Sequence, residues 1–205
     1  MVESANLWRL TRDPRYAEWT CAQLDFYADN YPRWPLRKNG TARLGCQSLE
    51  DATWLAPLVD SARLVFDYAG ETRRQAWFDK LLEPQAELLG KSHHYIHNIS
   101  TWHRASAAQV ALLYKDEALW TRAVDGPYGV REQIRRGVTS DYIWYEQAMG
   151  YNGYITVAMR PLLTLAGLTG KGERLRDEAA IVQNLLLAPA ALRFPDGTIP
   201  NPADA

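Results

Sequence analysis

Apolar residues recur every three or four positions along most of this 205-residue chain, and no other feature constrains its fold as strongly. Such spacing puts the apolar side chains on one face of a helix. The alternation of apolar and polar residues that marks a half-buried strand is almost absent. Helices of ordinary length joined by short loops predict an all-α fold, either a bundle or an array of helical hairpins.

The apolar spacing, and the Gly and Pro residues that interrupt it, give approximate helix bounds. Ser48, followed three residues later by Asp51, has the spacing of a capping box. A loop with Asn39-Gly40 precedes it, and 192–205 has the composition of a loop-like tail. No internal repeat is visible, so we expect a single helical domain over 1–205. Helices are expected over 14–30, 52–69, 71–89, 100–114, 116–124, 128–136, 147–168 and 173–187.

Charge balance and cysteine content argue against several classes of protein. The chain carries 23 basic and 24 acidic residues without a basic stripe, which argues against nucleic-acid binding. It has no run of about 18 apolar residues, so no membrane-spanning segment is expected. The first residues lack the basic and apolar regions of a signal peptide, which leaves the cellular location open. Cys21 and Cys46 are too few for a disulfide framework, and we expect both to be free and buried.

All four histidines of the chain fall between positions 93 and 103. Histidine titrates near neutral pH and suits proton transfer, anion neutralisation and metal ligation. The simpler interpretation is that these side chains cap a helix, pack against it or face water. The residues of this cluster are His93, His94, Tyr95, His97, Asn98, Trp102 and His103.

A second unusual segment runs from Asp141 to Tyr154 and combines four tyrosines, a tryptophan and two acids. It also contains Gly150 and Gly153, on either side of Tyr151. Glycine costs about 1 kcal/mol relative to alanine inside a helix. Two glycines here therefore indicate close approach of a ligand or of another backbone. The alternative is an aromatic-rich helix start that packs against a neighbouring helix.

Several short motifs in these two segments and around them occur in a characteristic order. In this order and spacing they resemble the heparinase II/III-like polysaccharide lyases, and the greatest likeness is to the oligoalginate lyase branch. The resemblance covers most of the chain, from about residue 20 to residue 200. The motifs are Cys46 to Trp54, Asn98 to His103, Gly126 to Gly129, Trp144 to Glu146, Gly150-Tyr151 and Phe194 to Pro200.

The resemblance implies a partial α/α toroid that carries the catalytic residues. In the family an antiparallel β-sheet domain follows the toroid, so we expect 1–205 to be the helical part of a longer enzyme, with that β-sheet domain as its partner. The implied substrate is an acidic oligosaccharide or polysaccharide that contains uronate, cleaved by β-elimination with no cofactor or metal. An oligoalginate is favoured over a sulfated glycan, because no groove rich in Lys and Arg is apparent. Family members are often periplasmic or secreted.

The resemblance also assigns catalytic roles. His97 and Asn98 match the family's pair at the substrate carboxylate, and Tyr151 matches its catalytic tyrosine. Donors on the carboxylate stabilise the enolate-like dianion that forms when the neighbouring proton is removed. Tyrosine then acts as base and as acid, which requires nearby cations because a free phenol titrates near pH 10.

Further residues are expected to contact the substrate around this centre. Aromatic side chains are expected to stack on the sugar rings, and cationic side chains to lower the pKa of the tyrosine. An acidic side chain is expected to orient a hydrogen-bond donor. One departure from the family is Asn152, which stands where relatives often have histidine. The expected substrate-binding residues are Trp102, His103, Arg104, Tyr145, Glu146 and Tyr154, with Arg160 as a further candidate cation.

Three alternatives remain open. His93 and His97 lie four residues apart, as two metal ligands on one helical face do, and His94 or Glu146 is a candidate third ligand. Asp141, with either Glu146 or Asp196, is a candidate for the paired carboxylates of a glycosidase. The third alternative is a helical remnant that binds uronate oligosaccharides without cleaving them.

Overall fold

The computed structural model describes residues 1–37 and 40–200. Over these residues the chain folds into helices and contains no strand, and one antiparallel bridge joins Val138 to Trp144. The predicted all-α fold is confirmed. Asn39 of the predicted turn and residues 201–205 of the predicted tail lie outside the described residues.

Most of the predicted helices are present within a few residues of their expected bounds, and α2 has the predicted bounds. The first helix, α1, was not predicted. The helix expected over 52–69 is interrupted at Val65, because α3 ends at Leu64 and α4 begins at Phe66. The predicted boundary between 69 and 71 coincides with a bend in α4 at Gly70, where φ is +74°. The helices are α1 (Val2–Thr11), α2 (Pro14–Asn30), α3 (Ser48–Leu64), α4 (Phe66–Trp77), α5 (Glu83–Gly90), α6 (Asn98–Tyr114), α7 (Glu117–Trp120), α8 (Val130–Gly137), α9 (Met149–Leu168) and α10 (Arg176–Ala191).

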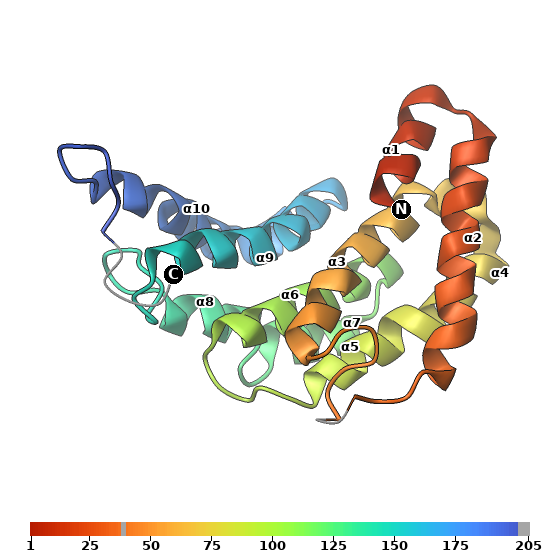
Figure 1. The fold of residues 1–205 in the computed structure, drawn as a ribbon, viewed down its shortest axis with the longest axis horizontal. Coiled ribbons are helices and arrows are strands. Elements are labelled where there is room, and N and C mark those ends of the chain that lie inside the picture. Colours follow the sequence, from red (N-terminus) through yellow and green to blue (C-terminus); the bar gives the residue numbers. More distant parts are fainter. Residues whose placement is uncertain (38–39, 201–205) are drawn as a thin grey trace.

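The central helix is α6, which packs against α3 and α9 and against α5, α7 and α8 (Figure 1). Every residue from Ser100 to Leu112 is buried. Small side chains let the neighbouring helices come close, because the distance between packed helices depends on the side chains at the contact. The small residues on α6 include Ala105, Ala107, Ala108 and Ala111.

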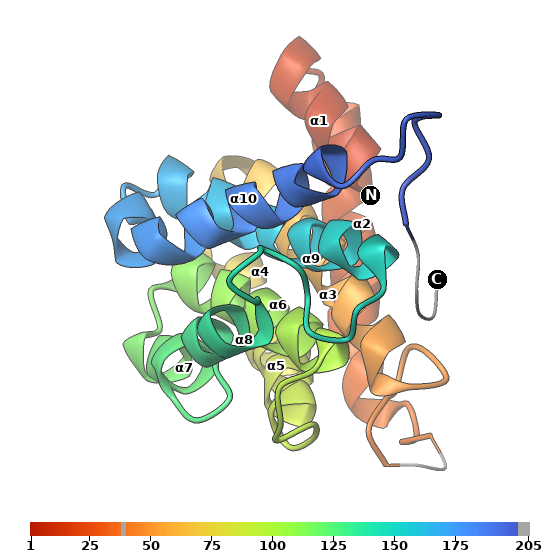
Figure 2. The same ribbon diagram turned by 90° about the vertical axis from the view of Figure 1, so that its left-hand side faces the viewer.

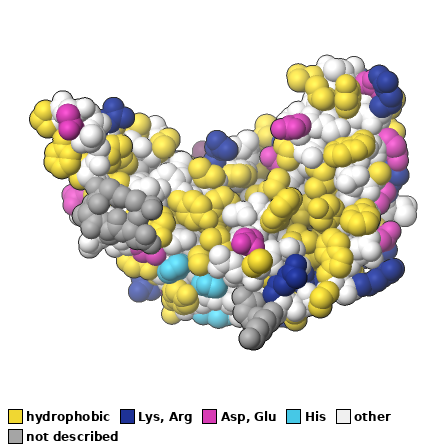
Figure 3. All heavy atoms as spheres, viewed as in Figure 1, with side chains coloured by type: hydrophobic (Ala, Val, Ile, Leu, Met, Phe, Trp, Pro, Cys, Tyr) yellow, Lys and Arg dark blue, Asp and Glu magenta, His cyan; other side chains and the backbone are white. Residues whose placement is uncertain are grey.

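Helices α3, α6 and α9 run in the same general direction, from left to right in Figure 1. Figure 2 views the molecule from that left-hand side, so their N-terminal ends face the viewer. The segments 91–97 and 139–148, which precede α6 and α9, therefore reach the same edge of the molecule. The surface is hollowed between two raised ends, one formed by α1 and α2 and the other by α10 (Figure 3).

Asp51 fixes the loop in front of α3. Its buried carboxylate accepts hydrogen bonds from the backbone N–H groups of Arg43 (2.8 Å), Leu44 (3.0 Å) and Gly45 (2.7 Å). Ser48 is the first helical residue rather than the N-cap, and no side chain caps this end. The predicted capping box is therefore wrong. The loop folds over the first turn of α3 and offers Asp51 three donors, whereas a capping box would offer it one.

We expect Asp51→Asn to lower the free energy of unfolding by about 1–3 kcal/mol, because an amide accepts at one oxygen only and turns its NH₂ group toward buried donors. Chemical denaturation measures the loss. The control is Asp60→Asn on the same helix, whose partly exposed carboxylate pairs with Arg63 at 3.0 Å. Its expected cost is below about 1 kcal/mol. Equal losses in the two variants would contradict the role given to Asp51.

Cys21 is buried, Cys46 is exposed, and both are free. The predicted burial is confirmed for Cys21 and wrong for Cys46, because Cys46 lies in the loop before α3 and not on the apolar face of a helix. Among the residues that the structure describes, no helix combines the length and the apolar character needed to cross a membrane.

Candidate functional site

The segment between α8 and α9 carries Glu146 to the start of α6. Two residues in it, Tyr142 and Gln147, have positive φ angles of 58° and 64°, which tighten its turns. The indole of Trp144 is fully buried against Gly137, where a Cβ atom would lie only 2.3 Å from the ring. Glycine at position 137 is therefore what lets this loop approach α8. The Tyr145 hydroxyl donates to the carbonyl oxygen of Ile96 at 2.7 Å and joins the two segments.

The carboxylate of Glu146 is the centre of a polar cluster at the N-terminus of α6. The Asn98 carboxamide donates from Nδ2 to both carboxylate oxygens, at 3.2 and 3.0 Å, and the Asn98 backbone N–H donates at 3.3 Å. His97 Nε2 lies 3.3 Å from Oε1, and the Trp144 indole N–H also donates to the carboxylate. The structure thus brings Glu146 to His97 and Asn98, although Glu146 follows Asn98 by 48 residues in the chain.

The hydrogen bonds of His97 define its tautomer. His97 is the N-cap of α6, and its Nδ1 accepts from the backbone N–H of Ile99 at 3.2 Å. Nδ1 therefore carries no proton, and the proton of the neutral ring is on Nε2, which faces Glu146. The His97 backbone N–H donates to Gln133 Oε1 at 3.0 Å, and Gln133 is itself held by the carbonyl oxygens of Tyr95 and Tyr128. The orientation of the imidazole is thus fixed, with Nε2 directed at Glu146.

Three aromatic side chains follow this cluster between α6 and α9. Trp102, one turn after Asn98, lies 5.2 Å from Tyr154 between ring centroids. Tyr151 lies one turn before Tyr154, with their centroids 6.3 Å apart, and is partly buried. Trp102 is only 7% exposed, which limits it as a sugar platform, whereas Tyr145 is 40% exposed. Burial raises the pKa of Tyr154, and the neighbouring Tyr151 adds to the shift.

Asn152 has a structural position. Its fully buried carboxamide accepts from the Trp144 backbone N–H at 2.9 Å and donates to the carbonyl oxygens of Tyr142 and Leu185, both at 3.0 Å. Asn152, the residue that departs from the family pattern, therefore connects the loop before α9 to α10 by hydrogen bonds. No part of this side chain faces the surface.

His103 and Arg104 do not join the Glu146 cluster. His103 is fully buried, and burial, with His93 and Arg104 nearby, lowers its pKa to about 3. Its ring lies 5.0 Å from that of His93. Arg104 is 6% exposed and lines a separate cavity with His94. Within the described residues, no three of the metal-binding types His, Cys, Asp and Glu are grouped to hold an ion.

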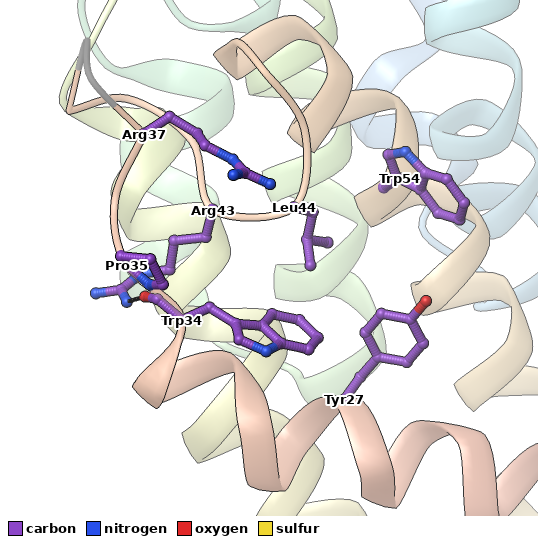
Figure 4. Close-up of a pocket in the computed structure, with 7 residues that line it drawn as sticks. All are labelled: Tyr27, Trp34, Pro35, Arg37, Arg43, Leu44 and Trp54. Atoms are coloured by element: carbon purple, nitrogen blue, oxygen red, sulfur yellow. Dashed lines mark hydrogen bonds between the residues drawn. The ribbon is translucent and has the colours of Figure 1, made fainter.

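Sequence reasoning missed a cavity of about 410 Å³ at the N-terminal end of α3, which is lined in part by aromatic residues (Figure 4). Trp54, expected on an apolar helix face, is 49% exposed there. Figure 4 shows Arg37 and Leu44 directed into the space beside it, while Arg43 turns outward. The sequence signal that could have revealed this cavity is the concentration of Tyr, Trp, Arg and Pro residues over 31–37. The cavity is lined by Tyr27, Trp34, Pro35, Arg37, Arg43, Leu44 and Trp54.

Two comparisons relate this chain to known proteins. A protein-family model described as "Alginate lyase" matches residues 2–182. A curated protein named "Alginate lyase", from Stenotrophomonas maltophilia (strain K279a), is 26% identical over 199 residues. The match covers 91% of this chain and 26% of that protein, so the chain spans about a quarter of the length of its relative.

Proposed function

Because this chain belongs to the alginate lyase family, we propose that it is the helical part of a polysaccharide lyase that cleaves uronate-containing glycans, oligoalginates among them, by β-elimination. The observation that carries the proposal is the Glu146 cluster. There Asn98 and His97 direct side-chain donors at one carboxylate, at distances of 3.0–3.3 Å. Donors arranged around a carboxylate of the protein suit the carboxylate of a uronate equally well.

In the proposed complex, the uronate carboxylate replaces Glu146 as the acceptor of the Asn98 Nδ2 and His97 Nε2 hydrogen bonds. Glu146 keeps the Trp144 indole N–H and the Asn98 backbone N–H, which hold it in the free protein as well. The donors then act on the charge that builds up on the substrate carboxylate as the adjacent carbon loses its proton. Because these donors are fixed before substrate binds, little reorganisation is needed during the reaction.

Tyr151 is proposed as the base and the acid. Its phenolate takes the proton from the carbon next to the carboxylate, and the electron pair forms the new carbon–carbon double bond as the bond to the glycosidic oxygen breaks. The same phenol then returns a proton to the leaving oxygen, so charge and protons balance. Arg160 lies nine residues further along α9, about 13 Å away. Arg160 is therefore left out of the proposed mechanism.

Aromatic residues beside the cluster and at the α3 cavity support sugar binding. Tyr145, which is 40% exposed, hydrogen-bonds the segment before α6, and Trp34, Trp54 and Arg37 line the cavity at α3. Aromatic faces suit sugar rings, and a guanidinium suits the carboxylates of a uronate chain. The parallel courses of α3, α6 and α9 agree with the inner helices of a partial α/α toroid of the heparinase II/III-like type, which we include in the proposal.

The direct test is incubation of the chain with oligomannuronate, oligoguluronate, glucuronan and heparin-derived oligosaccharides. β-Elimination creates a conjugated double bond, so we expect ultraviolet absorbance to rise with the alginate-derived substrates. Asn98→Ala is expected to lower the rate about 10²-fold, as loss of one oxyanion-type donor does. Saturable binding without any absorbance change would favour the non-catalytic remnant. The absence of both would contradict the proposal.

Glu146→Gln tests whether Glu146 and the substrate compete for the same donors. We expect the dissociation constant for an alginate oligosaccharide to fall about 3- to 10-fold, because the substrate no longer displaces or faces a carboxylate. Calorimetric titration measures the change. Asp141→Asn removes one exposed negative charge from the same loop and is expected to leave the constant within about twofold. Weaker binding by Glu146→Gln would mean that Glu146 holds the donors in place for the substrate.

A further inference from the structure

A second cavity, of about 510 Å³, lies on the other side of α6 from α9. In Figure 2, α9 lies above α6, whereas α5 and α7, which contribute to this cavity, lie below it. The volume is within the range of small-molecule sites. None of His97, Asn98, Glu146 and Tyr151 lines it. Its walls are mainly apolar and include Ala86, Ala107, Leu119, Ala123 and Pro127, and its charged residues are Glu87, Lys91, His94, Arg104 and Arg122.

The charges around this cavity do not balance. Arg122 pairs with Glu87, which leaves Lys91, His94 and Arg104 without an acid among the described residues. Arg104 is the unusual one, because it is 6% exposed. Its Nη2 makes one long hydrogen bond, 3.4 Å, to the carbonyl oxygen of Ser92, and its Nε has no partner among those residues. Burial lowers the pKa of this guanidinium, and no neighbouring acid opposes the shift.

Elsewhere the fold pairs its buried charges. Glu178 is fully buried and accepts from Arg131 and Arg135, each at 2.8 Å. Asp51 is fully buried and accepts from three backbone N–H groups. A buried charge without such partners is costly, and the cost is removed when an ion of opposite charge binds. Of these three buried charged side chains, Arg104 is therefore the one that lacks such partners. It lines a cavity large enough to admit an anion.

We propose that this cavity binds a small organic carboxylate with an apolar body, whose carboxylate pairs with Arg104. The guanidinium offers a planar fork that matches a carboxylate, and Lys91 adds a positive charge at the cavity. The apolar walls favour an organic body over a bare inorganic anion. This site is separate from the Glu146 cluster, and its occupancy does not depend on the proposed lyase activity.

Calorimetric titration of the full chain at constant ionic strength tests the site, with sodium benzoate, sodium glucuronate and inorganic phosphate as probes. We expect benzoate to bind at least about tenfold more tightly than phosphate, because only benzoate fills the apolar part of the cavity. Glucuronate distinguishes a sugar acid from an apolar one, and we expect it to bind more weakly here than benzoate. Binding of phosphate alone, or of none of the three, would overturn the proposal.

Arg104→Met separates a binding role from a structural one. Loss of a charged hydrogen-bonding pair is expected to raise the dissociation constant for benzoate about 10- to 100-fold. The unliganded variant is expected to melt at the same temperature or higher, because a buried, unpaired charge has been removed. Arg176→Met, at a mostly exposed arginine, is the control and should leave benzoate binding unchanged.

Arg104→Lys provides a second variant in case Arg104→Met does not fold. It keeps the charge and loses the planar fork, so we expect intermediate binding of benzoate. Benzoate binding that is unchanged in both Arg104→Met and Arg104→Lys would overturn the assignment of Arg104. A lower melting temperature of Arg104→Met together with unchanged binding would show that the arginine is structural.

Discussion

Tyr151→Phe is expected to lower the rate constant for uronate elimination by about 10²- to 10⁴-fold, the usual contribution of a general acid–base group. The change removes one hydroxyl and leaves the ring, so the contact with Tyr154 is kept. Because the carboxylate donors Asn98 and His97 are untouched, binding of the substrate is expected to persist. Initial rates from ultraviolet absorbance and binding by calorimetry measure the two quantities separately.

Tyr154→Phe is the matched control, because Tyr154 lies one turn further along the same helix and its ring borders Trp102. We expect its elimination rate to stay within about fivefold of the unaltered chain, since a sugar platform acts through its ring. Circular dichroism checks that both variants remain helical. If Tyr151→Phe keeps its full rate, or if the two variants lose activity equally, another residue must be the base.

The helical architecture could be predicted because it depends on local apolar spacing. Helix α2 begins after Asp13, whose carboxylate accepts from the Arg15 backbone N–H, and its first residue is Pro14. Both are ordinary helix-start signals. The break between α3 and α4 could not be predicted in this way, because the apolar pattern continues through Val65. The bend at Gly70, by contrast, falls at the predicted boundary between the helices expected over 52–69 and 71–89.

The site could be predicted only in part, because neighbours in sequence need not be neighbours in space. His103 follows Asn98 by five residues, which is about 140° around a helix, so the two side chains leave α6 on different sides. The same argument applies to Arg104. The motif resemblance selected Asn98, His97 and Glu146, and the structure places them in one cluster. The resemblance could not predict the hydrogen bonds that Glu146 accepts from His97 and Asn98. They depend on the position of the loop before α9, which the packing of Trp144 against Gly137 sets.

Burial of His103 leads to a second large effect, a loss of stability in acid. In the folded chain burial lowers its pKa to about 3, while an unfolded histidine titrates near 6.5. Between these values the unfolded chain binds a proton that the folded chain does not, so the free energy of unfolding falls as the pH falls. The slope from this one group is about 1.4 kcal/mol for each pH unit between about pH 6 and pH 4. Above pH 6.5 the contribution is constant.

Urea denaturation at several pH values between 7 and 4 measures this slope, and His103→Leu identifies its source. The leucine has no group to protonate and fills much of the same buried space, so we expect the slope to fall by about one proton, or 1.4 kcal/mol per pH unit. Burial also lowers the pKa of His93, so some acid sensitivity of the same sign should remain. Equal slopes for His103→Leu and the unaltered chain would mean that the ring accepts a proton without unfolding, for instance through water entering beside His93.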